Sequence, residues 1–179
     1  MNQNRDAMGR LPTLKTLLTS LLGLFSLVVP AYAEEKMLVY IATVPDKSDA
    51  QQGIYKTTLD TKTGALTSPE LVIKTNRSSF ITIHPNGRFL YACNEIGDFQ
   101  GKKTGAASAF SIDDPETGKL TPINDQPSGG QGPCYVRVDA SGKNLLVANY
   151  GGGSVAVLPI DVETGKLAAP SAAVQHVGN

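Results

Sequence analysis

Short runs of alternating hydrophobic and polar residues follow one another along most of the chain, from Met37 to Val177. Such alternation is typical of β-strands that bury one face. Three of these runs lead into the same kind of turn, in which an Asp is followed four residues later by a Gly. An Asp carboxylate can accept hydrogen bonds from backbone N–H groups two residues further on, and Gly adopts the positive φ that ends the turn. The turns Asp60–Leu66, Asp114–Leu120 and Asp161–Leu167 therefore predict strands joined in antiparallel meanders.

A longer repeat underlies this pattern. The segment His84–Asn94 matches Asp139–Asn149 at a constant offset of 55 residues, which is the separation of Gly87 and Gly142. A four-stranded meander that recurs every ~40–55 residues is typical of a β-propeller blade. A β-sandwich with accidental internal similarity is the alternative, but one constant offset across two strands favours the propeller. The four strands expected in one unit are Phe80–His84, Arg88–Asn94, Ala106–Ile112 and Lys119–Asn124.

The repeat predicts an all-β fold of about three four-stranded antiparallel blades, at about residues 37–74, 79–124 and 134–177. The first blade is expected to lack its innermost strand. Closed propellers have about four to eight blades, so a truncated propeller is expected. Open blade edges expose unpaired backbone groups, so self-association is the alternative way to complete the ring. The three strands expected in the first blade are Met37–Thr43, Gly53–Leu59 and Ala65–Lys74.

The first 33 residues carry a different pattern. Arg5, Arg10 and Lys15 give a positively charged start, an apolar run follows over Leu17–Val29, and Ala31–Ala33 places small residues around Tyr. These are the three parts of a secretory signal peptide. The sequence therefore predicts cleavage after residue 33, a mature domain over residues 34–179, and a secreted or periplasmic location without membrane attachment. An uncleaved membrane anchor is the alternative, although the run is shorter than the ~20 apolar residues that span a bilayer.

Charge and cysteine content add two constraints. Acidic and basic residues number 16 each, so no net field attracts nucleic acid or a membrane surface. The two cysteines, Cys93 and Cys134, fall in expected strands, where the repeat places Ala148 and Ser79. Export would permit a disulfide, but these positions favour two small buried side chains.

Strand direction assigns the loops to two ends of the blades. In a meander, the turns after the first and third strands share one end, which holds His84–Gly87, Asp139–Gly142 and the three Asp-Gly turns. His84 takes the place of Asp139 there and is expected to be a structural turn residue. The loops after second strands and before first strands share the other end. These mouth loops, residues 76–79, 94–95, 129–133 and 149–153, would surround the opening of the central channel.

The mouth loops supply most candidate site residues. Glu95 is a candidate for acid–base catalysis, and its carboxylate could also bind a cation. Asn94 and Asn149 could orient a carbonyl or a hydroxyl, and Arg77 could pair with an anion. No zinc-type spacing, phosphate loop or nucleophile elbow occurs, so no metal or cofactor is expected. The candidate substrate contacts are Asn94, Glu95, Asn149, Tyr150, Arg77 and, at the end of the last expected strand, His176.

Four strings together resemble the lactonase family of seven-bladed β-propellers, which is similar to 6-phosphogluconolactonase. They are Arg88–Glu95, Gly129–Cys134, Leu145–Val155 and Val174–His176. The resemblance implies hydrolysis of a small-molecule sugar lactone to the aldonic acid, in carbohydrate metabolism, and about three blades of seven. It also implies that the family's His-containing motif, with an Arg and a Glu, falls after Asn179. The catalytic residues are therefore expected there, and little or no activity is expected from these three blades alone.

Two other functions remain open. A calcium-dependent gluconolactonase-like propeller would use Glu95, Asn94 and Asn149 as oxygen ligands for a hard cation. An exported propeller that only binds a partner is the alternative outside the enzymes. Export also favours an unphosphorylated lactone, since phosphorylated sugar lactones are cytoplasmic metabolites.

Overall fold

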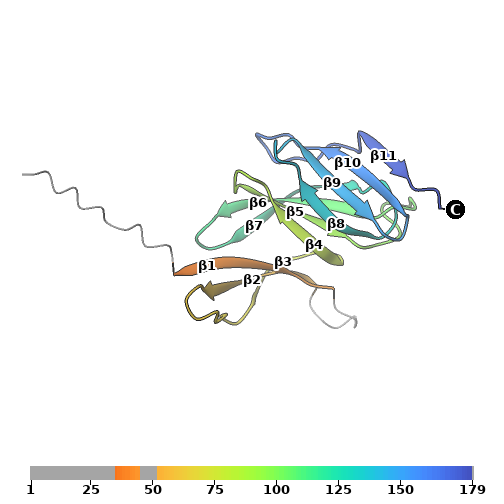
Figure 1. The fold of residues 1–179 in the computed structure, drawn as a ribbon. Coiled ribbons are helices and arrows are strands. Elements are labelled where there is room, and N and C mark those ends of the chain that lie inside the picture. The colour runs from red at the N-terminus through yellow and green to blue at the C-terminus, as the bar shows by residue number, and fades with distance from the viewer. Residues whose placement is uncertain (1–34, 45–51, 179) are drawn as a thin grey trace, which may run out of the picture. The chain divides into compact units, whose positions relative to one another are not determined.

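The computed structural model describes residues 35–44 and 52–178, all within one compact unit that spans Glu34–Asn179. The predicted signal peptide, residues 1–33, lies outside the described residues. The described part contains eleven antiparallel strands and no helix, in three sheets that follow one another along the chain (Figure 1). Within it, no helix is long and apolar enough to cross a bilayer. The strands are β1 (Lys36–Ala42), β2 (Gly53–Asp60), β3 (Glu70–Lys74), β4 (Ser78–Ile83), β5 (Phe89–Asn94), β6 (Ala106–Asp114), β7 (Lys119–Pro127), β8 (Pro133–Val138), β9 (Asn144–Asn149), β10 (Ser154–Pro159) and β11 (Ala172–Gln175).

Each sheet is a meander in chain order. The first is β1-β2-β3, the second β4-β5-β6-β7 and the third β8-β9-β10-β11, with antiparallel pairing between all neighbours. Four-stranded radial sheets joined by short connections are the blades of a propeller. The predicted all-β partial propeller is therefore confirmed, and among the described residues the first sheet has three strands, as expected.

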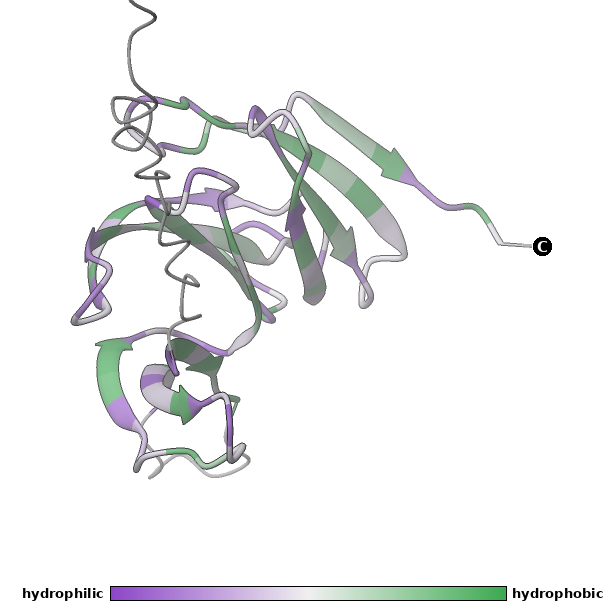
Figure 2. Cartoon of the chain, turned by 60° about the vertical axis from the view of Figure 1, so that its left-hand side comes forward, coloured by the Kyte–Doolittle hydropathy of each residue, from purple (hydrophilic) through white to green (hydrophobic). Residues whose placement is uncertain are grey.

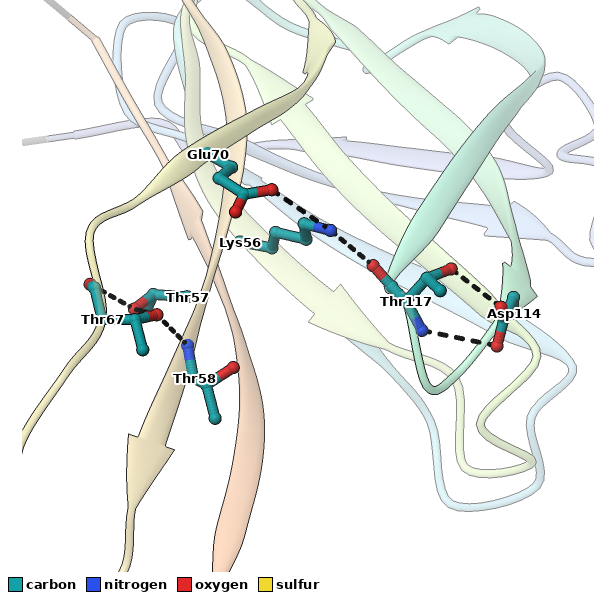
Figure 3. A network of polar contacts seen from close by, with 7 residues as sticks. All are labelled: Lys56, Thr57, Thr58, Thr67, Glu70, Asp114 and Thr117. Atoms are coloured by element: carbon teal, nitrogen blue, oxygen red, sulfur yellow. Dashed lines mark hydrogen bonds and ion pairs between the residues drawn. The ribbon is translucent and has the colours of Figure 1, made fainter.

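The third strand of the first sheet starts later than predicted. The prediction began it at Ala65, whereas β3 begins at Glu70 and Leu66 forms only an isolated bridge with Leu59. Thr67 explains the difference, because its side chain and carbonyl take the bonds that a ladder would use. Thr57 Oγ1 donates to Thr67 O at 2.8 Å, and the Thr58 N–H donates to Thr67 Oγ1 at 3.0 Å (Figure 3).

Side chains of β5 alternate between the two neighbours of the second sheet. Tyr91 and Cys93 belong to a buried cluster that the second sheet shares with Leu145 and other residues of the third sheet. Leu90 belongs to a second cluster, which includes Ile54 of the first sheet. Each fully buried Leu or Ile contributes about 1.5–3 kcal/mol relative to an exposed one. Hydrophobic residues accordingly lie along the strands, and many turns are hydrophilic (Figure 2).

At the end of the sheets that carries the Asp-Gly turns, which we name the turn end, neighbouring sheets are joined by hydrogen bonds. Lys56 of the first sheet donates to the carbonyl of Thr117, in the β6–β7 turn, at 2.9 Å, and also pairs with Glu70 at 3.4 Å (Figure 3). The Tyr91 hydroxyl of the second sheet donates to the carbonyl of Gly165, in the β10–β11 turn, at 3.1 Å. The predicted structural turns therefore also connect one sheet to the next.

Both cysteines are free thiols. Cys93 is buried, lies 3.4 Å from Ser79 Oγ through its sulfur, and has a thiol pKa that burial raises. Cys134 is only partly buried, so the prediction of two buried side chains is wrong for this residue. The reason is its position beside Ala148 and Val155, in a cavity on a side of the third sheet that the described residues leave uncovered.

One face of the third sheet is apolar and exposed. Leu145 and Val147 belong to the buried cluster with the second sheet, so the alternating Leu146 points the other way. The exposed fractions of Leu146, Val155 and Val174 are 42%, 54% and 62%. Exposed apolar patches of this kind mark surfaces that contact other protein. Self-association through open blades stays a prediction.

Candidate functional site

The mouth loops of the second and third sheets form one hydrogen-bonded array. The Glu95 N–H donates to the carbonyl of Arg77 at 2.8 Å, which joins the loop after β5 to the loop before β4. The Gly132 N–H donates to the carbonyl of Ile96 at 2.9 Å, which joins the second sheet to the third. The Tyr150 N–H then donates to the carbonyl of Gly132 at 2.9 Å. The structure thus brings Arg77, Glu95 and Tyr150 to the same end of the sheets, opposite the turn end.

Arg77 and Glu95 are the most closely connected pair. Besides the backbone bond, the Arg77 Nε–H donates to the Glu95 carbonyl oxygen at 2.9 Å. The Glu95 side chain is partly buried, and within residues 35–44 and 52–178 its carboxylate forms no hydrogen bond or ion pair. Arg77 has a φ of +50°, a left-handed conformation that costs a non-Gly residue about 1–2 kcal/mol. An uncommitted carboxylate beside an uncommitted guanidinium edge is an arrangement that can act on a ligand.

Asn94 and Asn149 occupy equivalent repeat positions, and both are buried, with 6% and 2% exposed. Asn94 Nδ2 donates to the Asn76 carbonyl at 2.8 Å, and its Oδ1 accepts from Ser108 Oγ at 2.7 Å. Asn149 Nδ2 donates to the Ser128 carbonyl at 3.1 Å, but its Oδ1 has no hydrogen-bond partner. Both amides hold the mouth loops in place, and a direct contact with substrate stays a prediction for each.

Tyr150 and His176 differ in their surroundings from the buried asparagines. Tyr150 is 83% exposed, so its hydroxyl is accessible to a ligand. His176 is exposed, and its backbone N–H donates to the Gly153 carbonyl at 2.9 Å. Both side chains line a cavity of about 630 Å³ on the open side of the third sheet, together with Cys134. The structure therefore places His176 at the correct end but beside the outermost strand, away from Arg77 and Glu95.

A second cavity, of about 310 Å³, was missed by the sequence reasoning. It lies between the first and second sheets at the mouth end and is lined by Ile73, Asn76, Asn94, Phe99 and Phe110, among others. Its size is at the lower limit of small-molecule pockets. A hint existed in Phe99, an aromatic residue in the insertion after β5, but only the spatial approach of β3 to β7 completes the cavity.

At the turn end, His84 and the Asp carboxylates of the described turns are held by hydrogen bonds. His84 is 6% exposed, its Nε2 lies 2.8 Å from the Gly142 carbonyl, and its Nδ1 accepts from the Asn86 N–H at 3.1 Å. Hydrogen bonds also lower the pKa of turn carboxyls. The backbone N–H of Thr63 donates to Asp60, and that of Glu163 donates to Asp161. The structural role predicted for His84 agrees with this geometry.

Across the described ranges, 35–44 and 52–178, no group of three or more His, Cys, Asp or Glu side chains is placed to hold a metal ion. Asn94 and Asn149 donate their Nδ2 groups to different loops, at the Asn76 and Ser128 carbonyls.

Comparison with known proteins gives one consistent result. A family model described as "Lactonase, 7-bladed beta-propeller" matches residues 38–179. The chain is 34% identical over 143 residues to 6-phosphogluconolactonase of Bacillus subtilis, and 35% identical over 129 residues to 6-phosphogluconolactonase of Formosa agariphila. Those matches cover 80% and 72% of this chain. The solved structure of the periplasmic gluconolactonase of Pseudomonas aeruginosa matches with a TM-score of 0.69, 30% identity and 79% of this chain covered.

The chain is short beside these relatives. It spans 38% of the Bacillus subtilis protein, 35% of the Formosa agariphila protein and 39% of the Pseudomonas aeruginosa chain. The three sheets of this chain therefore match only part of the relatives' propellers.

Proposed function

Because the chain belongs to the seven-bladed β-propeller lactonase family, we propose that it forms part of an enzyme that hydrolyses a sugar lactone. The names of its relatives supply the substrate class, a gluconolactone with or without a 6-phosphate. The observation that carries the proposal in this chain is the hydrogen bonding of Glu95 to Arg77 at the mouth end, where neither charged end has a partner among the described residues. Ring opening would place the chain in carbohydrate metabolism.

The chemistry follows from what the mouth loops present. Hydrolysis of a lactone needs a base that takes a proton from water as the water attacks the ester carbonyl, and donors that stabilise the oxyanion. Glu95 is the candidate base in this chain, because its carboxylate has no partner among the described residues and its backbone is fixed at both its N–H and its carbonyl. The exposed Tyr150 hydroxyl is a candidate donor to the oxyanion. The remaining catalytic groups are expected from the blades beyond this chain.

The proposal can be tested in a complete propeller. We suggest a chimera in which residues 35–178 replace the matching segment of the Bacillus subtilis 6-phosphogluconolactonase. Opening of gluconolactone and of its 6-phosphate would be followed by proton release. We expect turnover by the chimera and a loss of about 100-fold or more in kcat on Glu95→Gln, since a general base contributes roughly 10²–10⁴-fold.

The matched control is Glu116→Gln, which removes a carboxylate from the turn end that has no side-chain hydrogen bond among the described residues. It should leave kcat unchanged. Circular dichroism and a thermal melt confirm that each variant is folded. A folded chimera that turns over the lactone equally well with Gln at position 95 would rule out Glu95 as the base. Activity that is lost with a chelator and restored by Ca²⁺ would support the calcium-dependent alternative instead.

We also infer that the protein is exported, with a signal peptide over residues 1–33. The charged start at Arg5 and Arg10, the apolar run Leu17–Val29 and the small residues before Glu34 support this. A relative described as periplasmic adds support. Mass spectrometry of protein recovered from the medium or periplasm should find Glu34 as the first residue. A retained N-terminal Met with membrane association would contradict cleavage.

A further inference from the structure

We infer that Arg77 is an anion anchor: its free guanidinium edge, beside Glu95, binds a phosphate or carboxylate group of the ligand. The inference deepens the proposed function and depends on it only for the identity of the ligand. The group bound at the mouth end would be the phosphoryl group of a phosphorylated lactone or the carboxylate of an aldonic acid.

The backbone of Arg77 is the first observation. Among the described residues, only Arg77 and Gln100 are non-Gly residues with positive φ. The repeat places Gly132 at the position of Arg77, and Gly132 has nearly the same φ, +55° against +50°. Gly adopts this conformation without a steric penalty, whereas Arg does not. The second sheet therefore carries a strained Arg where the third sheet shows that Gly satisfies the fold.

Arg77 and Gly132 also accept equivalent backbone hydrogen bonds. The carbonyl of Gly132 accepts from the Tyr150 N–H at 2.9 Å, just as that of Arg77 accepts from the Glu95 N–H at 2.8 Å. The backbone connection is thus complete without a side chain. Residues held in strained conformations persist where function requires them, which points to the Arg77 side chain and not to its backbone.

The direction of the guanidinium is the second observation. Arg77 Nε–H donates to the Glu95 carbonyl at 2.9 Å, and the Arg77 N–H donates to Gln52 Oε1 at 3.1 Å. Both contacts fix the start of the side chain. Within the described ranges, the two terminal nitrogens make no hydrogen bond or ion pair, and the residue is exposed. The free Nη1–Nη2 edge offers two parallel N–H donors, the geometry that matches a carboxylate or phosphate bidentately.

The surrounding position suits a ligand that also meets Glu95. Arg77 directly precedes β4, the first strand of the second sheet, and β4 contacts β8, the first strand of the third sheet. Arg77 and Glu95 are held to each other through their backbones, while their charged ends make no ion pair with each other. An anion on Arg77 would therefore place the rest of the same small ligand near the carboxylate.

Binding can be measured without any hydrolysis. We would titrate the full chain with glucose 6-phosphate, gluconate and glucose, and follow the ¹⁵N resonance of Arg77 Nε together with calorimetry. The informative variant is Arg77→Gly, because Gly is the residue that the repeat uses at this position. Arg77→Lys retains the charge but lacks the planar pair of donors.

For Arg77→Gly we expect affinity for an anionic probe to fall by about 10-fold or more, with an unchanged or higher urea midpoint. Loss for glucose 6-phosphate alone would identify a phosphate site, and loss for gluconate alone a carboxylate site. Arg77→Lys should bind more weakly than the wild type, and glucose should not distinguish the variants. The inference is overturned if the wild type binds neither anion, if Arg77→Gly binds as well as the wild type, or if that variant unfolds. Anion binding that depends on Arg77, in a protein whose complete form opens no lactone, would retain the anchor and reject the proposed function.

Discussion

Acidic residues at the two ends of the sheets make different contacts. The Asp carboxylates of the turn end bind their own turns, whereas the Glu95 carboxylate at the mouth end does not. At the turn end, Asp114 accepts from the Glu116 N–H at 2.9 Å and from Thr117 Oγ1 at 2.9 Å, so the carboxylate is consumed by its own turn. At the mouth end, the carboxylate of Glu95 has no such partner in the described part, while its backbone is fixed. The comparison shows that a carboxylate stays available where the hydrogen bonds that hold its loop use its backbone groups and not its own oxygens.

The same contrast extends to the glycines and the residues with positive φ. Gly165 at the turn end has a φ of +72° and lies against Phe89, so the position needs Gly for both conformation and space. Arg77 at the mouth end has a similar left-handed backbone but carries a long charged side chain. Gly165 is therefore required for both backbone conformation and space, whereas Arg77 is a non-Gly residue held in a strained conformation.

Gly165→Ala is the change with the largest expected effect, and it would test the packing role of the turn end. A Cβ at this position would lie 2.4 Å from Phe89 Cδ1, and Phe89 is 4% exposed within the cluster between sheets. We expect a loss of about 2–4 kcal/mol in the free energy of unfolding, from left-handed strain and overpacking together. Urea denaturation of the chain measures it.

The matched control is Gly64→Ala, in the equivalent turn of the first sheet. Gly64 has a φ of +74°, but no heavy atom lies within 4 Å of a Cβ built there. Only the conformational cost of about 1–2 kcal/mol is then expected. Equal losses in the two variants would show that the turn does not pack against the neighbouring sheet, and the comparison between the two ends would fail.

A smaller effect is expected from acid, and it should be confined to the turn end. The pKa values of five carboxyls are lowered from 3.8 by hydrogen bonds. They are Asp60 with Thr63, Asp113 with Ser111, Asp114 with Thr117, Asp139 with Asn144 and Asp161 with Glu163. A carboxyl with a lowered folded-state pKa stabilises the fold above its unfolded value, and this stabilisation disappears as the pH falls through the folded value. We therefore expect the urea midpoint to fall as the pH drops below 3.8.

Asp161→Asn should weaken this acid dependence, because one of the five responding carboxyls is removed. Glu163→Gln is the control in the same turn, since the Glu163 carboxylate holds no backbone N–H among the described residues. Midpoints measured from about pH 6 to about pH 2 decide the matter. If Asp161→Asn follows the wild type at every pH, the turn carboxylates are not responsible for acid unfolding.

The fold could be predicted from the sequence because it repeats. The constant offset between Gly87 and Gly142 fixed which loops share an end, and the hydrogen bonds of Glu95 and Tyr150 agree with that assignment. Strand limits were less accessible where side chains replace ladder bonds, as Thr67 does before β3. Repetition reports backbone register well, since the backbone pattern is what recurs.

The end of the sheets that carries each candidate site residue was predictable, but the contacts of that residue were not. The segments around Asn94 and Asn149 look alike, but Asn94 Oδ1 accepts from Ser108, whereas Asn149 Oδ1 has no partner among the described residues. The difference arises because β6 places Ser108 where β10 places Ala156. The left-handed backbone of Arg77 was likewise hidden, although its alignment with Gly132 could have revealed it.

The bond from the Gly132 N–H to the Ile96 carbonyl has a consequence for any attempt to transplant this region. It ties the segment that follows Glu95 to a loop of the next sheet, and Gln131 Nε2 adds a bond to the Gly97 carbonyl at 2.8 Å. The position of the Glu95 carboxylate therefore depends on two sheets. Inserting or deleting a residue in 129–133 would shift Glu95, although the change lies in another segment. Segments 94–97 and 129–133 should therefore be grafted together.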